Sequence, residues 1–376
     1  MPVAEQELRQ GEVFFDYYVN PPLQPGEELS LQTLLQIRTG FVFGPPGSGK
    51  TTLRLALEAE CRSVDYRTLA VRYEFGRKMT HVPSPEEHYR ALAEELAVDL
   101  FIQAVERLAS LDMPSSPQRD ALRRQMRLVW PRLRRTVQLL LQEDFSDREN
   151  GLADLWPRLN RPAVRYVPPS GKVKRVIEEC LPADGTPPPS PQGETLLQAG
   201  IADARLWGYR QIFVLVDEVD AIERTAGRML ALIAPLVEHL ARWQAEDLFF
   251  FFFLPPELQP PLQKTYRQTL ENLPFPPGWF TFRWEKEPLM KLLHRRLRAA
   301  GSRSPGLDAL ASGEWTGSLE DELAREAAHS PRRLLQLVST LVDVHARRDP
   351  QRPLITPRDW EETLKQWRDE ERASTP

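Results

Sequence analysis

The segment that most constrains the fold of this chain is a glycine-rich octapeptide, GPPGSGKT, at Gly44–Thr51. It fits the pattern G-x-x-x-x-G-K-[ST], follows the apolar segment Gln36–Phe43, and precedes Leu53–Arg62, whose leucines are spaced along one helical face. Glycines in this pattern let backbone N–H groups wrap a phosphate chain at the start of a helix. The segment therefore predicts a strand, a phosphate-binding loop and a helix in succession. A glycine-proline turn without function is the alternative interpretation.

Two side chains of this loop have a defined role in phosphate chemistry. The Lys50 ammonium group is expected to reach the β- and γ-phosphates of a nucleotide, and the Thr51 hydroxyl is expected to bind Mg²⁺. The base is expected to be adenine, because no asparagine of the chain begins the guanine-reading sequence Asn-Lys-x-Asp. The loop residues predicted to contact the nucleotide are Gly44, Pro45, Pro46, Gly47, Ser48, Gly49, Lys50, Thr51 and Thr52.

A second motif ends an apolar strand in two acids. Ile212–Val216 predicts a buried strand, and Asp217 and Glu218 follow it directly. Next to a phosphate-binding loop, Asp217 is expected to hold Mg²⁺ through water, and Glu218 is expected to orient and deprotonate an attacking water. The alternative is a strand end capped by solvated acids.

A third motif begins a helix near the C-terminus, at Ser330–Leu337. Ser330 is predicted to be the N-cap, and Pro331 suits the first helical turn. An arginine at this helix start, Arg332 or its neighbour Arg333, is placed to reach a γ-phosphate. A solvated basic helix face is the alternative interpretation.

The remaining apolar segments predict the rest of an α/β fold. Strands are expected at Thr68–Glu74, Leu248–Leu254 and Gly278–Trp284, separated by helical stretches, which favours a parallel sheet covered on both faces. After Trp284 the chain is expected to be helical, with breaks at Gly301–Gly306, Gly313–Gly317 and Asp349–Pro357.

A long insertion, Phe75–Arg210, separates the second predicted strand from the third. Its first part predicts two helices, Pro85–Leu111 and Gln118–Gln142. Its second part, Val167–Gly193, is rich in proline and glycine and predicts a loop or linker.

Composition sets the class of protein around these motifs. A net charge of −4 is too small for an acidic tail or a general nucleic-acid binder, and two cysteines form no disulfide framework. Met1–Gln10 lacks the apolar core of a signal peptide, and the longest apolar run is too short to cross a membrane. We therefore expect a soluble, cytoplasmic protein without a membrane partner. The six histidines and two cysteines show no spacing typical of a zinc site.

The arginines gather most densely in Arg119–Arg135, which holds seven of them in 17 residues. This segment is interpreted as a solvated helix face, and a surface that binds phosphate backbone or an acidic partner is the alternative.

The loop, the acidic strand end, a further strand and the Ser-Pro-Arg-Arg helix together resemble the AAA+ ATPases, and most nearly the origin-recognition-like and STAND branch of prokaryotic ATPases. By this resemblance Gly44–Thr51 is the Walker A motif, Asp217-Glu218 is Walker B, and Arg332 is the sensor-2 arginine that also contacts nucleotide. The implied catalytic residues are Glu218, Lys50 and Arg332. The implied Mg²⁺ ligands are Thr51 and Asp217.

The resemblance also implies a domain organisation. Residues 1–28 form an N-terminal extension, and residues 29–284 form a P-loop core of AAA+ type that includes the insertion at 75–210. Residues 285–376 form a helical lid, with Leu354–Trp367 as its final helix.

The function implied is Mg²⁺-dependent ATP hydrolysis that switches the conformation of a partner-binding protein. A protein partner, self-assembly and DNA all remain open, in DNA remodelling or in a signalling or defence system. One departure matters: Leu248–Leu254 ends without the polar sensor-1 residue of the family, and Pro255 follows it. The alternative is therefore a nucleotide-binding scaffold that does not hydrolyse ATP and recruits a protein effector. Arg242 and Arg267 lie in plausible regions for a trans-acting arginine, and neither is assigned.

Overall fold

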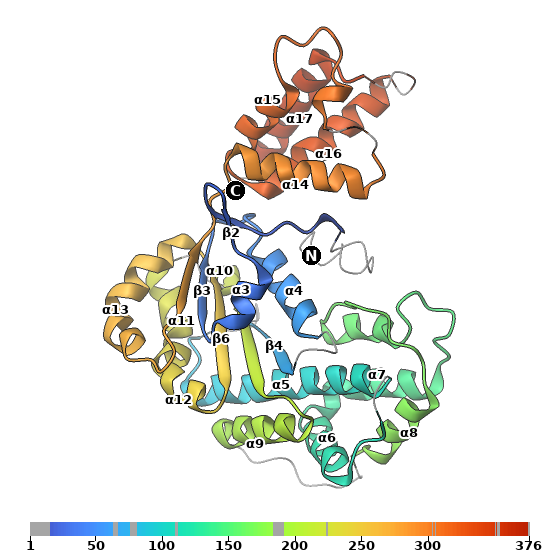
Figure 1. Cartoon of the computed structure of the whole chain (residues 1–376), viewed down its shortest axis with the longest axis vertical. Helices are drawn as coiled ribbons and strands as arrows, with labels where there is room; N and C mark the ends of the chain where they lie inside the picture. Colours follow the sequence, from blue (N-terminus) through green and yellow to red (C-terminus); the bar gives the residue numbers. More distant parts are fainter. Residues whose placement is uncertain are drawn as a thin grey trace. The chain divides into compact units, whose positions relative to one another are not determined.

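The computed structural model describes residues 16–62, 67–75, 81–109, 112–182, 192–222, 225–302, 304, 306–349, 351 and 354–374. The fold is of the α/β class, as expected (Figure 1). The chain divides into two compact units. The first holds residues 31–43 and the described part of 51–280. The second holds residues 44–50 and the described parts of 13–30 and 281–376.

The first unit is built on a five-stranded sheet with the order β4-β5-β6-β3-β7. The pairs β4–β5, β5–β6 and β6–β3 are parallel, which confirms the expected parallel arrangement. Every residue of β6, LFFFFFL, is buried, as expected for a central strand covered on both faces. The strands are β3 Gly40–Phe43, β4 Thr68–Glu74, β5 Gln211–Asp217, β6 Leu248–Leu254 and β7 Gly278–Thr281.

The order of the strands determines which strand ends lie next to each other at the carboxyl edge of the sheet. Strand β6 lies between β3 and β5, and it pairs Leu254 with Phe43 at its carboxyl end. On the other side of β5, Glu74 of β4 lies directly opposite Asp217. The carboxyl edge of the sheet therefore places two acids side by side.

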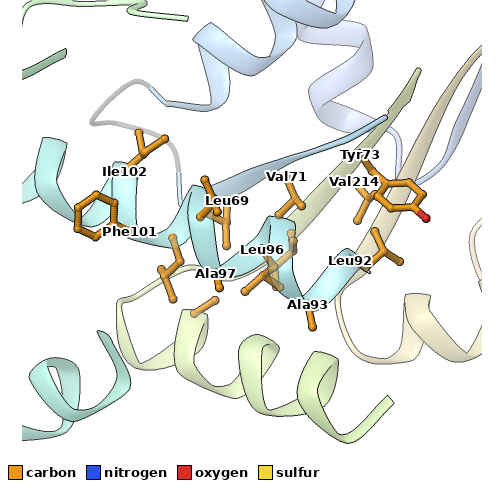
Figure 2. Close-up of a cluster of buried hydrophobic side chains, with 14 of the residues drawn as sticks. Leu69, Val71, Tyr73, Leu92, Ala93, Leu96, Ala97, Phe101, Ile102 and Val214 are labelled. Atoms are coloured by element: carbon orange, nitrogen blue, oxygen red, sulfur yellow. The ribbon is translucent and has the colours of Figure 1, made fainter. Parts of the chain in front are cut away.

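Helix α5, Pro85–Leu108, is the longest helix of the first unit, and it is buried between the sheet and helix α9, Gly193–Leu206. Ser84 caps its start, and Glu87 completes a reciprocal capping box. Figure 2 shows its apolar side chains packed against those of β4 and β5. The side chains drawn include Leu69, Val71, Tyr73, Leu92, Ala93, Leu96, Ala97, Phe101, Ile102 and Val214.

The other helices of the first unit connect the strands or form the insertion. The connecting helices are α3 Leu31–Gln36, α4 Lys50–Cys61, α10 Val219–Ile222, α11 Ala226–Glu238, α12 Leu240–Ala245 and α13 Gln259–Glu271, with the short turn η2 Pro256–Leu258. The insertion adds α6 Ser116–Leu128, α7 Trp130–Gln142, η1 Leu152–Leu159 and α8 Gly171–Glu179.

Four predictions about elements were wrong in detail. The strand expected from Gln36 begins at Gly40, because LQTLLQ before it forms helix α3 and buries Leu34. The strand expected to reach Trp284 ends at Thr281.

The helix expected over Gln118–Gln142 is two helices that meet at Val129, just before the Trp-Pro pair that starts α7. Proline lacks the N–H that would continue the first helix.

The loop expected over Val167–Gly193 contains helix α8. Its apolar residues Val173, Val176 and Ile177 lie on one buried face, and no proline of the segment falls inside the helix. Residues 183–191, which hold most of those prolines, lie outside the described residues.

The second unit is mainly helical in its C-terminal part. It contains α14 Lys286–Ala299, η3 Asp308–Leu310, α15 Leu319–Ala327, α16 Pro331–Arg348 and α17 Pro357–Ser374. The small hairpin β1 Pro22–Gln24 and β2 Glu27–Glu28 belongs to the same unit, where the Arg283 N–H donates to the Pro22 carbonyl. Across the described part of the chain, none of the helices combines the length and the apolar character needed to cross a membrane.

Candidate functional site

The two predicted metal ligands lie in contact with each other. Thr51 stands in the first turn of α4, and Asp217 is the last residue of β5. The Thr51 Oγ1 hydroxyl donates a hydrogen bond of 3.0 Å to Asp217 Oδ2. Hydroxyl and carboxylate oxygens are hard ligands, which suit Mg²⁺. The residues present therefore fit the cation that the sequence implies.

No cluster of three or more His, Cys, Asp or Glu side chains suited to a metal occurs within the described ranges. Mg²⁺ in nucleotide sites is held by one or two protein groups together with phosphate oxygens and water. A hydroxyl and a single carboxylate are thus a sufficient protein contribution.

Arg54 is a member of this site that the sequence did not reveal. It lies one turn after Lys50 on α4, and its side chain is 0% exposed. Its Nε donates to Asp217 Oδ2 at 3.0 Å, the same oxygen that Thr51 contacts. A buried guanidinium requires such partners, because an unpaired charge away from water is costly.

Glu74 is the second unpredicted acid of the site. It ends β4 opposite Asp217, and Arg54 reaches it at 3.2 Å. Burial acts to raise the pKa of Glu74, but the charges of Arg54 and Arg72 outweigh it and hold the pKa below its ordinary value. Glu74 is therefore a carboxylate fixed in its charged form beside Asp217.

Glu218 has an unusual backbone and an unusual acidity. Its φ of +63° lies in the left-handed region, which costs a non-glycine residue about 1–3 kcal/mol and is common at functional sites. Its N–H donates to Asp217 Oδ1 at 2.9 Å. Burial raises the pKa of Glu218 to about 7, and the nearby charges of Glu74 and Asp217 add to this effect. A carboxyl with a pKa near neutrality is suited to accept and release a proton.

The glycine-rich loop belongs to the second unit, and its conformation depends on its glycines. Gly47 and Gly49 have φ of +83° and +91°, values that other residues rarely adopt. A Cβ on Gly44 would meet Ser48 Oγ at 2.3 Å. The Lys50 Nζ folds back and donates to the Gly44 carbonyl at 2.6 Å. The predicted contact residues Pro45 and Pro46 are exposed, and Thr52 follows Thr51 on α4 as a half-buried residue.

Helix α16 begins against this loop, within the same unit. Ser330 caps the helix by accepting from the Arg333 N–H at 3.3 Å, which confirms the predicted cap. The Arg332 N–H donates to the Gly47 carbonyl at 3.3 Å. A Cβ on Gly47 would lie 3.0 Å from the Cβ of Arg332 and 3.1 Å from Ser330 Oγ. The predicted site residues Gly47 and Arg332 are thus in contact, through a backbone hydrogen bond and through the close approach of the Arg332 Cβ to Gly47.

The carboxyl end of β6 carries no polar side chain. Leu254 ends the strand and Pro255 follows it, between the ends of β3 and β5. The two arginines considered for a trans-acting role both have carboxylate partners in the chain. Arg242 pairs with Glu194, and Arg267 pairs with Glu271 at 2.9 Å.

Comparison of the sequence with models of known protein families and with curated proteins gave no match.

Proposed function

We propose that this chain binds ATP and Mg²⁺ on the loop Gly44–Thr51 and hydrolyses the nucleotide, as the resemblance to AAA+ ATPases of the origin-recognition-like and STAND branch implies. One observation carries the proposal. The hydroxyl that follows the P-loop lysine is bonded, at 3.0 Å, to the carboxylate that ends strand β5. The sequence assigns Mg²⁺ to these two residues, 166 positions apart, for independent reasons.

Each residue has a distinct role in the proposed reaction. Lys50 and the loop N–H groups bind the β- and γ-phosphates, and Thr51 and Asp217 hold Mg²⁺, which supplies charge neutralisation of the phosphates when bound. Glu218 accepts the proton of the attacking water, a role for which a pKa of about 7 is well placed. Arg332 reports the γ-phosphate from the start of α16. The switch that results acts on a protein partner, on further copies of the chain or on DNA.

A second candidate function is a nucleotide-binding scaffold with little turnover. The apolar end of β6, Leu254-Pro255, favours it, because no polar side chain of that strand end is available to position the γ-phosphate or the water. Phosphate release at steady state separates the two functions, since a scaffold binds ATP without forming free phosphate.

The direct test of nucleotide binding is Lys50→Ala. Removal of the one full charge directed at the β- and γ-phosphates is expected to abolish ATP binding in an equilibrium titration with Mg²⁺-ATP. Lys264→Ala, on helix α13, is the control and should bind as the parent does. Near-parental affinity of Lys50→Ala would remove the nucleotide site from this loop.

A further inference from the structure

Both oxygens of the Asp217 carboxylate are already held by groups of the chain itself. Oδ1 accepts the Glu218 N–H at 2.9 Å. Oδ2 accepts two donors at 3.0 Å, the Thr51 hydroxyl and the Nε of Arg54. One of these donors carries a full positive charge. The carboxylate to which Mg²⁺ is assigned is therefore paired with a cation of the protein.

The position of Arg54 is fixed by three carboxylates at once. Besides Asp217, its guanidinium reaches Glu74 at 3.2 Å and Glu58 at 3.5 Å. The side chains of Arg54 and Glu58 are almost fully buried, at 0% and 2% exposure. If the Nε bond to Asp217 breaks, Glu74 and Glu58 still pair the charge, so the guanidinium need not enter an unpaired state. The arrangement thus allows Arg54 to leave Asp217 without losing all its partners.

We propose that Arg54 is an internal counter-ion of Asp217 that competes with Mg²⁺ for Oδ2 and so sets the concentration of divalent cation that the site requires. This inference rests on the proposed function of the loop and deepens it. A hydrated Mg²⁺ whose water binds Oδ2 and a guanidinium bonded to the same oxygen repel each other, and both compete for the lone pairs of that oxygen. Arg54 therefore withdraws towards Glu74 and Glu58 when the cation binds. It is a positioning residue, since it acts through Asp217.

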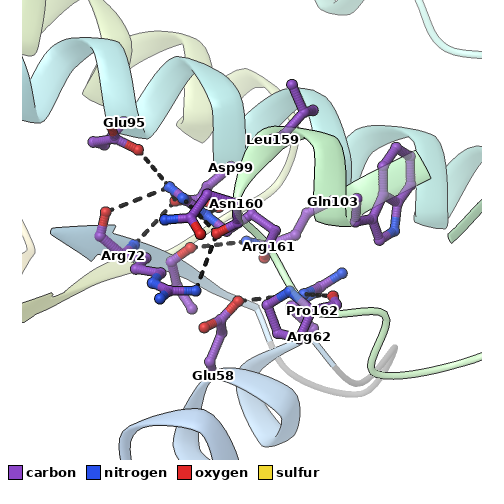
Figure 3. Close-up of polar contacts among 12 residues, drawn as sticks. Glu58, Arg62, Arg72, Glu95, Asp99, Gln103, Leu159, Asn160, Arg161 and Pro162 are labelled. Atoms are coloured by element: carbon purple, nitrogen blue, oxygen red, sulfur yellow. Dashed lines mark hydrogen bonds and ion pairs between the residues drawn. The ribbon is translucent and has the colours of Figure 1, made fainter. Parts of the chain in front are cut away.

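A neighbouring arginine provides a matched control. Arg72 also pairs with Glu74, at 2.6 Å, and donates to the Asn160 carbonyl of the insertion at 3.0 Å. Figure 3 shows this part of the polar network, in which Asp99 and Arg161 also take part. The contacts of Arg72 given above reach Glu74 and Asn160, whereas those of Arg54 include Asp217 itself. Removing Arg72 therefore takes away a similar charge and leaves the bond from Arg54 to Asp217 in place.

The experiment measures metal binding, separately from turnover. Binding of a fluorescent ADP is first measured in EDTA for the parent, Arg54→Met and Arg72→Met. Mn²⁺, a paramagnetic substitute for Mg²⁺, is then titrated into each ADP complex, and the electron paramagnetic resonance signal of free Mn²⁺ reports what is bound. Arg54→Met is expected to bind Mn²⁺ about tenfold more tightly than the parent, as the loss of a contacting positive charge predicts. Arg72→Met should show a clearly smaller change.

The outcomes separate this inference from the proposed function. Unchanged or weaker Mn²⁺ binding by Arg54→Met, or an equal gain in Arg72→Met, overturns the competition and leaves nucleotide binding intact. Absence of ADP binding by the parent in EDTA and with Mg²⁺ overturns the proposed function, and the inference with it. If circular dichroism shows that Arg54→Met is unfolded, Arg54→Gln is used. Glutamine removes the positive charge and keeps a polar hydrogen-bond donor beside Asp217. This variant should still bind Mn²⁺ more tightly than the parent, and parental binding overturns the inference.

Discussion

At the scale of single residues, the site is a set of charges whose protonation and pairing are set by burial. Asp217 and Glu74 face each other across β4 and β5, and Arg54 joins them. Glu218 stands next to this pair, and burial together with the charges of Glu74 and Asp217 raises its pKa above that of an ordinary glutamate. In the proposed site, Asp217 therefore holds the cation, and the neighbouring Glu218 accepts the proton.

Replacement of Glu218 by glutamine separates binding from chemistry. The amide keeps the shape of the side chain and loses the base, so ATP binding should persist while kcat falls by roughly 10²–10⁴-fold. Phosphate release and nucleotide binding are measured side by side, with the exposed Glu271→Gln as control. Turnover at the parental rate would identify Glu218 as a strand-end residue without a catalytic role.

His88 predicts how stability depends on pH. Its ring is buried on α5, its Nδ1 lies 2.6 Å from the Tyr73 hydroxyl, and burial lowers its pKa to about 4. The unfolded chain, with an ordinary histidine pKa of about 6.5, binds more protons between these values. The contribution of neutral His88 to stability is therefore fully present above about pH 6.5 and is lost as the pH is lowered to about 4, by about 3 kcal/mol in all.

The measurement is urea unfolding at several pH values for the parent and His88→Gln. The glutamine variant cannot take up this proton, so its free energy of unfolding should fall less steeply over the same range. An identical slope in both proteins would show that other groups cause the acid sensitivity.

At the scale of elements, the contact between the glycine-rich loop and the start of α16 predicts that replacing Gly47 and replacing Gly49 by alanine cost different amounts of stability. Gly47 and Gly49 share a left-handed φ, so alanine strains the backbone at either position by about 1 kcal/mol or more. Only the alanine at position 47 also meets Arg332 and Ser330, because nothing lies within 4 Å of a Cβ on Gly49. Gly47→Ala should therefore destabilise the protein more than Gly49→Ala in urea unfolding. Equal losses would mean that α16 does not pack against the loop in solution.

The elements also show what the sequence could and could not predict. Strand β6 was predicted with its observed ends and β4 likewise, because apolar runs buried on both faces have a strong local signal. Thr51, Asp217 and Glu218 were found from motifs. Arg54 was not, because an arginine within the mainly apolar helix LRLALEAEC has no local mark of a partner 163 residues away. Glu74 was missed for the same reason, since only the strand order brings it beside Asp217.

The arginine-rich segment 119–135 has ion pairs that bear on its two interpretations. Among its arginines, carboxylates of the chain pair with Arg119, Arg123, Arg124 and Arg132. Arginines that already pair with carboxylates of the chain neutralise fewer phosphates, and so release fewer of the counterions that surround a nucleic acid. The pairing therefore favours a solvated helix face over a nucleic-acid surface.

At the scale of the whole molecule, the proposed nucleotide-driven switch requires a partner, and a second copy of the chain is one candidate. Charge supplied in trans by a second copy would compensate for the apolar end of β6. We expect ATP to favour a higher-order form of the Glu218→Gln variant over the nucleotide-free protein. Light scattering with and without Mg²⁺-ATP measures the mass directly. An unchanged monomer mass at micromolar concentrations would rule out self-assembly of this kind and point to a different protein as the partner.

Strand β6 has a further consequence, for the way the chain reaches its native state. Strand β6 lies between β3 and β5 in the sheet but follows β3, β4 and β5 in the chain. During synthesis, the edges of β3 and β5 that pair with β6 therefore stay unpaired until β6 has been added. A run of five phenylalanines is also a segment prone to intermolecular pairing when exposed. Refolding from denaturant should therefore compete with aggregation, with a yield that falls as protein concentration rises. Strand β6 is fully buried in the folded sheet, and the same segment is prone to aggregate while it is exposed during synthesis.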